Sequence, residues 1–201
     1  FKQNLMSGYV LNSIFCLISI IFTVEVIVNF IKERILFLET QSTEQTIGQY
    51  YTDTFDDFLL AEAVITTYNT FIIDGHLVKE FFSGDVNDTD PLPEQAFSQW
   101  KDLRSLCFDL IKGKRTPVNF KIILHLKNSL VAELLSRGDT SVTPSDIKAL
   151  VLNLKYDGSI LTCITGTAFH SFLPDKTPDK LWDEYISHFL TEKGISFEEN
   201  I

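Results

Sequence analysis

The sequence predicts an α+β domain: a single antiparallel sheet of about four to five strands packed against helices, preceded by an N-terminal hydrophobic helix. Apolar and polar residues alternate over residues 118–126, which is typical of a strand with one buried face. Asp157-Gly158 is a typical hairpin turn, and strands joined by a hairpin pair antiparallel. An apolar helical stripe within residues 95–112 supplies an element that can cover the buried face of such a sheet.

Composition excludes several classes of protein. Of the 201 residues, 45% are hydrophobic and 22% are charged, which is incompatible with disorder over most of the chain. Lys and Arg number 17 against 27 Asp and Glu, so the formal net charge is −10. Binding to a nucleic-acid backbone requires cations that neutralise its phosphates, and we therefore expect no nucleic-acid partner.

An uncharged, apolar leader precedes an acidic globular part. Residues 1–39 carry three basic and three acidic side chains, so residues 40–201 hold the whole net charge of −10. In residues 9–31, 17 of 23 positions are apolar, a length and composition that suit a transmembrane helix. Lys32 and Arg34 follow this segment, and the positive-inside rule then places the globular part in the cytoplasm.

Two other interpretations of the leader stay open. The chain begins at Phe1, and the Phe, Ile, Asn and Lys content of residues 1–39 also resembles translated AT-rich DNA upstream of a true start. The second is a buried or interfacial helix. Membrane contact is expected through residues 9–31 alone, and without it the protein is expected to be cytoplasmic.

The expected elements of the globular part alternate between helices and strands. A short helix is expected over residues 43–51. Residues 60–74 are rich in Thr, Ile, Val and aromatic residues, which predicts one strand. Asp74-Gly75 predicts a turn directly after that strand.

A solvated loop over residues 83–94 is expected to lead into the helix over residues 95–112. Gly113 is placed to end this helix. Its apolar residues recur at helical spacing on one stripe, formed by Leu103, Leu106, Cys107, Leu110 and Ile111.

Thr143-Pro144 is typical of an N-cap followed by proline at the first helical position, which predicts a short helical turn. A strand over residues 150–156 is expected to follow. The final helix is expected to begin at Thr177 and to end at Gly194.

A two-residue turn at Asp157-Gly158 predicts the register of the hairpin. In that register three pairs share the buried face, namely Leu154 with Leu161, Leu152 with Cys163, and Leu150 with Thr165. The other face holds Asn153 with Thr162 and Lys155 with Ile160.

The sequence contains none of the common catalytic motifs. The phosphate-binding loop, the dinucleotide-binding Gly-rich turn, the zinc-protease helix motif, C-x-x-C and the nucleophile elbow are all absent. We therefore expect no cofactor and no metal site. Four groups of residues remain as candidates for function.

The first group is a basic turn in an otherwise acidic domain. Lys112, Lys114 and Arg115, with Lys121 nearby, lie together without an acidic neighbour. They could cradle a phosphate, with Arg115 as a bidentate partner and Lys114 as a point charge. The alternative is that cations gather at a helix C-terminus because the helix dipole favours them there.

The second group is Asp74 and His76 on either side of Gly75, with Glu80 one turn further on. A carboxylate and an imidazole at this separation could hold a metal or share a proton; the alternative is a turn with a surface histidine.

The third group is the single residue Glu62, which lies in an apolar strand and could act as a general acid if buried. On the solvent face of an edge strand it would have no such role.

The fourth group is the pair Cys107 and Cys163. Cys16, Cys107 and Cys163 are too few and too dispersed for a disulfide framework or a zinc site. Free thiols in apolar surroundings fit a reducing compartment. Cys107 and Cys163 fall on predicted apolar faces, so we expect them to be core residues.

Three stretches carry a resemblance to a known family: DTFDDFLL at residues 53–60 running on to IDGH at 73–76, LCFDLIKGKRTP at 106–117, and LTCITGT at 161–167. In these the chain resembles a small bacterial family, known mainly from anaerobic Gram-positive bacteria and catalogued as a domain of unknown function. The resemblance covers about residues 40–201. It implies one cytosolic domain that begins near Leu36–Thr40 without a hydrophobic leader, and it implies no activity, cofactor or catalytic residue.

Two classes of function follow from these observations. We expect a non-catalytic binding or accessory module on the cytoplasmic side, with an unknown protein or a small anionic ligand as its partner. No set of acid, base, nucleophile and orienting residue emerges that would favour an enzyme. The alternative is an enzyme or binder that acts on a phosphate-bearing small molecule through residues 112–115, with Glu62 or Asp74 in the same cleft.

Overall fold

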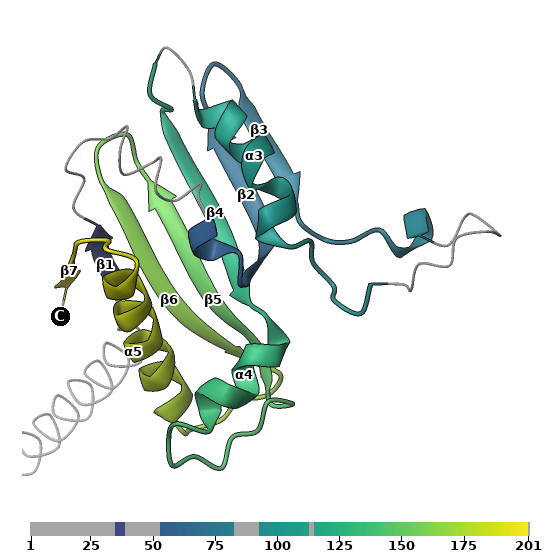
Figure 1. Cartoon of the computed structure of the whole chain (residues 1–201), viewed down its shortest axis with the longest axis vertical. Coiled ribbons are helices and arrows are strands. Elements are labelled where there is room, and N and C mark those ends of the chain that lie inside the picture. Colours follow the sequence, from purple (N-terminus) through teal and green to yellow (C-terminus); the bar gives the residue numbers. More distant parts are fainter. Residues whose placement is uncertain (1–34, 39–52, 83–92, 113–114, 201) are drawn as a thin grey trace, which may run out of the picture. The chain divides into compact units, whose positions relative to one another are not determined.

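A computed structural model describes residues 35–38, 53–82, 93–112 and 115–200. They form a seven-stranded, fully antiparallel sheet in the order β3-β2-β4-β5-β6-β1-β7 (Figure 1). The strands are β1 (Ile35–Leu38), β2 (Phe58–Thr66), β3 (Thr70–Asp74), β4 (Asn119–Leu126), β5 (Ile147–Tyr156), β6 (Leu161–Phe169) and β7 (Phe197–Asn200). The helices are α3 (Trp100–Ile111), α4 (Asn128–Leu135) and α5 (Thr177–Glu192), with 3-10 turns η1 (Asp53–Phe55) and η2 (Lys79–Phe82).

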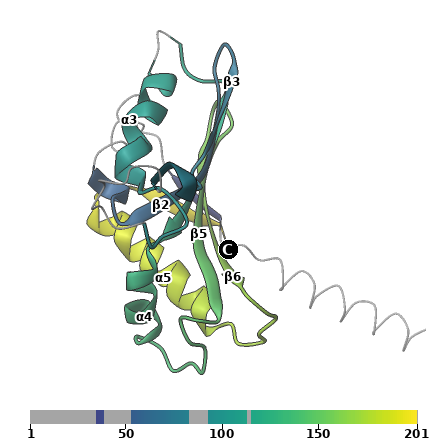
Figure 2. The same ribbon diagram turned by 90° about the vertical axis from the view of Figure 1, so that its right-hand side faces the viewer.

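Helices α3, α4 and α5 all lie on one face of the sheet (Figure 2). The core fills the space between them and the sheet, because β2, β4, β5 and β6 each turn a row of large apolar side chains toward the helices. Trp182 of α5 is fully buried and donates its indole N–H to the carbonyl oxygen of Val151 on β5 (2.9 Å). Its ring lies 6.3 Å from the ring of Phe58 on β2.

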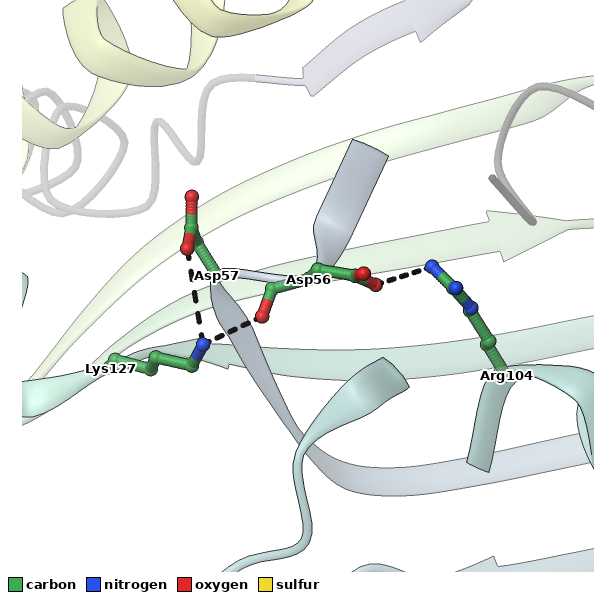
Figure 3. Close-up of polar contacts among 4 residues, drawn as sticks. All are labelled: Asp56, Asp57, Arg104 and Lys127. Atoms are coloured by element: carbon green, nitrogen blue, oxygen red, sulfur yellow. Dashed lines mark hydrogen bonds and ion pairs between the residues drawn. The ribbon is translucent and has the colours of Figure 1, made fainter. Parts of the chain in front are cut away.

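A polar cluster on the helix side ties η1, α3 and the end of β4 together (Figure 3). Arg104 of α3 donates to the carboxylate of Asp56 at 2.6 Å, and the Lys127 ammonium donates to the Asp56 carbonyl oxygen at 2.7 Å. The same ammonium lies 3.9 Å from the Asp57 carboxylate. Arg104 and Asp56 are less than one-third exposed, so the contact is shielded from solvent more than an ordinary surface pair is.

The predicted α+β class and the single antiparallel sheet are confirmed. Strands β2 to β6 match the predicted four to five strands, and the short β1 and β7 extend the sheet at one edge. The alternating strand at residues 118–126 is β4, with every second side chain buried. The final helix begins at Thr177 as predicted, and Gly194 follows it with a φ of +69°.

The prediction of one strand over residues 60–74 is wrong, because this part of the chain forms two strands, β2 and β3. The chain reverses at residues 67–69, and the amide of Thr67 donates to the carbonyl oxygen of Asn69 (2.9 Å). Strands β2 and β3 pair on either side of this reversal. Because both strands are rich in β-branched residues, composition did not reveal the turn between them.

Helix α3 begins at Trp100, five residues later than predicted. Residues 96–98 are held extended by backbone hydrogen bonds: the amide of Leu77 donates to Ala96, and the amide of Ser98 donates to Gly75. The predicted stripe of α3 is only partly buried, since Cys107 and Ile111 lie in the core while Leu106 is 48% exposed.

Helix α4 was not predicted, although it buries Val131, Leu134 and Leu135 at helical spacing. Its eight residues are too short for periodicity to stand out beside the preceding strand. The helical turn predicted at Thr143-Pro144 is a hydrogen-bonded turn that precedes β5, in which Thr143 is bound to the Asp146 carboxylate.

The predicted register of the β5–β6 hairpin is wrong by two residues. Leu154 faces Cys163, Leu152 faces Thr165 and Leu150 faces Thr167. On the other face, the observed pairs are Asn153 with Ile164 and Lys155 with Thr162, in place of the two predicted pairs. Because a shift of two preserves the side-chain alternation, the same residues still face the core.

The loop of this hairpin explains the shift. The Asp157 carboxylate accepts hydrogen bonds from the amides of Ser159 and Ile160, both at 2.9 Å, and from the Ser159 hydroxyl. These bonds stabilise a four-residue loop between Tyr156 and Leu161 in place of a two-residue turn. Gly158 has a φ of +100° in this loop, a conformation that glycine adopts without strain.

Several predictions concern residues that lie outside the described ranges. They are the transmembrane helix at 9–31, the short helix at 43–51, most of the loop at 83–94, and Gly113. In the ranges that the structure describes, no helix is long and apolar enough to cross a membrane.

A β-bulge in β2 shapes the strand that leads to the predicted carboxylates. Leu60 pairs with Leu124 and Glu62 with Ile123, so Ala61 is an extra residue on β2. Gly75, just after β3, docks against this bulge, and its amide donates to the carbonyl oxygen of Ala61 (3.0 Å). A Cβ atom on Gly75 would lie 1.8 Å from the carbonyl oxygen of Leu60.

We predict that Gly75→Ala destabilises the fold by roughly 2 kcal/mol or more, because the added methyl group collides with backbone atoms that cannot move aside. Thermal or denaturant unfolding measures the loss. Gly166→Ala is the control: nothing lies within 4 Å of its added Cβ, and its effect is expected to stay below about 1 kcal/mol. Equal stability of the two variants would contradict the close packing of Gly75 on the bulge.

Candidate functional site

The face of the sheet opposite the helices, called here the open face, brings three of the predicted site residues together. Glu62 on β2 lies directly opposite Asp74 on β3, and His76 follows Asp74 by two residues. The bulge is responsible for the position of Glu62, because both Leu60 and Ala63 are fully buried on the helix side. Without the extra residue, Glu62 would share the face of Leu60.

Glu62 forms an ion pair on this face. Its carboxylate lies 2.6 Å from the Lys121 ammonium of β4, and both side chains are about two-fifths exposed (40% and 41%). Sequence reasoning left open whether this carboxylate is buried or solvent-facing. The structure places it between these extremes, paired with a lysine of the neighbouring strand.

Asp74 and His76 form a close pair. The Asp74 carboxylate accepts a hydrogen bond from the His76 amide (2.9 Å) and lies 2.6 Å from Nδ1 of the same imidazole. Both contacts lower the pKa of the Asp74 carboxyl below its usual value. The hydrogen bond from the His76 backbone amide has the larger effect, and the contact with the imidazole has the smaller one. This pairing engages Nδ1 with the carboxylate, so Nε2 is the ring nitrogen that remains for a further partner. Glu80 of η2, grouped with them in the sequence, is exposed.

A second histidine, which sequence reasoning missed, completes the group. The His76 ring lies 4.3 Å from the Phe97 ring, and Phe97 lies 5.0 Å from His125 on β4. Burial, followed by the nearby charges of His76 and Lys148, lowers the pKa of His125. A signal was present, because His125 falls on the same polar side of the alternating strand as Lys121. Only strand pairing shows that this side meets Asp74 and His76.

The basic turn does not join this group. The Lys112 ammonium lies 5.2 Å from the centre of the Phe108 ring on its own helix, and Arg115 is exposed. Lys114 lies outside the described residues. The chain that follows the basic turn meets β2 at Thr66, whose carbonyl oxygen accepts a hydrogen bond from the amide of Val118. Thr66 lies four residues along β2 from Glu62, a separation of about 13 Å at the usual rise of a strand.

Two concavities are relevant, one beside the strands and one between the helices. One, of about 410 Å³, lies beside β2, β4 and β5 and is lined by Val64, Asn119, Phe120, Lys121, Lys155, Tyr156 and Asp157. The other, of about 510 Å³, lies between α4 and α5 and contains none of the predicted residues. Burial and then the carboxylate of Asp57 raise the pKa of Tyr185, which lines it.

The chemistry available at the open face is proton exchange and charge pairing. In the part of the chain that the structure describes, no three His, Cys, Asp or Glu side chains are grouped to hold a metal ion.

Cys107 and Cys163 are buried and free, and burial raises the pKa of the Cys107 thiol to about 12, so it stays protonated. Burial raises the pKa of the Cys163 thiol as well.

Comparison with known proteins identifies a family. The model of a family described as "Family of unknown function (DUF5721)" matches residues 50–198, which confirms the resemblance to a domain of unknown function. No curated protein and no solved structure matches the chain.

We predict that His125 titrates below the ordinary histidine value of 6.5, and that His76→Gln raises its pKa without restoring that value. The variant removes a neighbouring charge, while burial, the larger cause, remains. An NMR titration of the imidazole protons measures both values. A pKa of His125 unchanged by His76→Gln would contradict the coupling of the two rings.

The same shift gives a dependence of stability on pH. Because the pKa of folded His125 is lowered, the unfolded chain binds more protons just below pH 6.5, and the fold loses stability as pH falls through this range. His125→Gln is expected to flatten that part of the stability profile, as measured by denaturant unfolding at several pH values. Parallel profiles for the two proteins would rule out this contribution.

Proposed function

The chain belongs to the family of unknown function DUF5721, and we propose that it is a non-catalytic binding module that accepts an extended segment of a partner protein at the free edge of β3. The observation that carries the proposal is the outward direction of the β3 backbone. This mode of binding, in which a peptide adds a strand to a sheet, draws its affinity from main-chain hydrogen bonds.

Hydrogen-bond alternation determines which β3 groups are free. The amide of Gly75 donates to Ala61, and the amide of Thr67 donates to Asn69, so both positions are hydrogen-bonded pairs of the β2–β3 ladder. Hydrogen-bonded and non-hydrogen-bonded pairs alternate along an antiparallel ladder. The backbone N–H and C=O groups of β3 that point away from β2 are therefore those of Thr70, Ile72 and Asp74.

Nothing that the structure describes pairs with this side of β3, which ends the strand order of the sheet. Natural edge strands are protected by lysine, proline, a bulge or a covering element. The sequence of β3, Thr-Phe-Ile-Ile-Asp, contains no lysine or proline, and its pairing with β2 is regular. Thr70, Phe71, Ile72 and Ile73 have high β propensity, which favours pairing with a further strand.

Apolar side chains flank the free edge. Ile72 is 70% exposed on the open face, and Tyr68 in the adjoining loop is 86% exposed, with its ring 5.8 Å from the Phe71 ring. Exposed apolar side chains beside an unpaired edge provide the side-chain contacts that give strand addition its specificity. A partner segment with apolar residues at alternate positions fits this surface.

We predict that Ile72→Pro weakens partner binding and leaves the fold intact. Proline removes the outward N–H of residue 72, a group that makes no bond to β2, and proline is tolerated where a strand N–H faces solvent. Peptides selected from a random display library on the wild-type protein are expected to bind Ile72→Pro about tenfold more weakly or worse. Their binding is expected to slow amide exchange at Thr70, Ile72 and Asp74.

Two variants separate backbone pairing from other causes. Ile72→Thr keeps the amide and the β propensity, so it is expected to retain most of the affinity. Ile73→Pro removes an amide that donates to β2, and it is expected to destabilise the fold by about 3 kcal/mol. Failure to select any peptide, or equal binding to Ile72→Pro, would refute the proposal. A dimer that Ile72→Pro dissociates would assign the edge to a second copy of the chain.

A further inference from the structure

We infer that Lys121 and Lys155 form a binding site for the phosphate group of a small molecule on the open face of the sheet. The site is separate from the β3 edge and from the basic turn that the sequence singled out. The two lysines are far apart in the sequence, and the pairing of β4 with β5 places them directly opposite each other.

Strand geometry brings these two side chains close together. Because β2 residues 62, 64 and 66 do not bond to β3, they bond to β4, where Val64 pairs with Lys121. Lys121 therefore directs its backbone groups to β2, and Lys121 with Lys155 is a non-hydrogen-bonded pair of the β4–β5 ladder. In pairs of this kind the side chains are closer than in hydrogen-bonded ones.

Like charges directly opposite each other destabilise a sheet. Glu62 balances Lys121 at 2.6 Å, while Lys155 is exposed and has no carboxylate within ion-pair distance among the described residues. This juxtaposition of two cations stands out in a chain with a net charge of −10. An anion between the two ammonium groups would remove the repulsion.

The neighbouring concavity provides room for such an anion. Its volume of about 410 Å³ falls in the range of small-molecule sites, and both lysines line it. Asn119, two residues before Lys121 on the same face of β4, also lines it and carries an amide that can donate to a phosphate oxygen. Two ammonium groups and one amide match the acceptor oxygens of a phosphate.

The acidic groups around this concavity are already engaged. Glu62 is paired with Lys121. Asp157, which lines the concavity, holds its Oδ1 in its own loop through three hydrogen bonds from Ser159 and Ile160. Of the two lysines, Lys155 is the one without a carboxylate partner among the described residues, so it is the residue on which the test depends.

The test is a titration of the full chain with inorganic phosphate and with a simple phosphomonoester, glycerol phosphate, at constant ionic strength, followed by NMR amide shifts. Lys155→Gln is expected to raise the dissociation constant roughly tenfold, the factor for one charged hydrogen bond. Lys148→Gln removes an exposed lysine from the same strand and is the matched control, expected to bind phosphate as the wild type does.

Folding is checked in phosphate-free buffer. Lys155→Gln is expected to be at least as stable as the wild type, because it removes a like-charge contact, so weaker binding cannot be attributed to unfolding. Absence of phosphate-dependent shifts at β4 and β5, or equal weakening by Lys155→Gln and Lys148→Gln, would overturn the site. The outcome is independent of the β3 edge, since Ile72→Pro is expected to leave phosphate binding unchanged.

Discussion

The bulge at Ala61 determines what each face of the sheet presents. Leu60 and Ala63 on either side of it are both fully buried, so the strand continues to supply the core while Glu62 turns outward. The bulge also supplies the carbonyl oxygen that receives the amide of Gly75, and this contact positions the Asp74–His76 pair at the end of β3. A single extra residue thus places two carboxylates and an imidazole on the open face.

The helices make the two faces of the sheet unequal. Their side is closed by a continuous core and by the contacts of Arg104 and Lys127 with the loop before β2. On the opposite side, the half-buried ion pair of Glu62 with Lys121 and the rings of His76, Phe97 and His125 lie on the face that no described helix covers. Groups available for binding are therefore concentrated on one face and along one edge.

The proposals for this face and for the β3 edge depend on different interactions. Strand addition at β3 depends on uncharged backbone groups and on apolar contacts, so it is expected to be insensitive to salt. Phosphate binding between Lys121 and Lys155 depends on charge and is expected to weaken as ionic strength rises. Both fit the expectation of a binding module, and they act on different strands, so either can hold without the other.

Local pattern in the sequence determined the class of the fold and most of its elements. Alternation in β4 and the periodicity of α5 depend on neighbours within a few residues, and both predictions agree with the structure. Sequence also singled out Glu62, Asp74 and His76, but it grouped Lys121 with the basic turn and passed over His125 and Lys155. Those relations arise from the bulge, from the four-residue loop after Tyr156 and from the pairing of β4 with β2 and β5. Only the tertiary structure decided them, because strand register depends on backbone hydrogen bonds between segments that are distant in the chain.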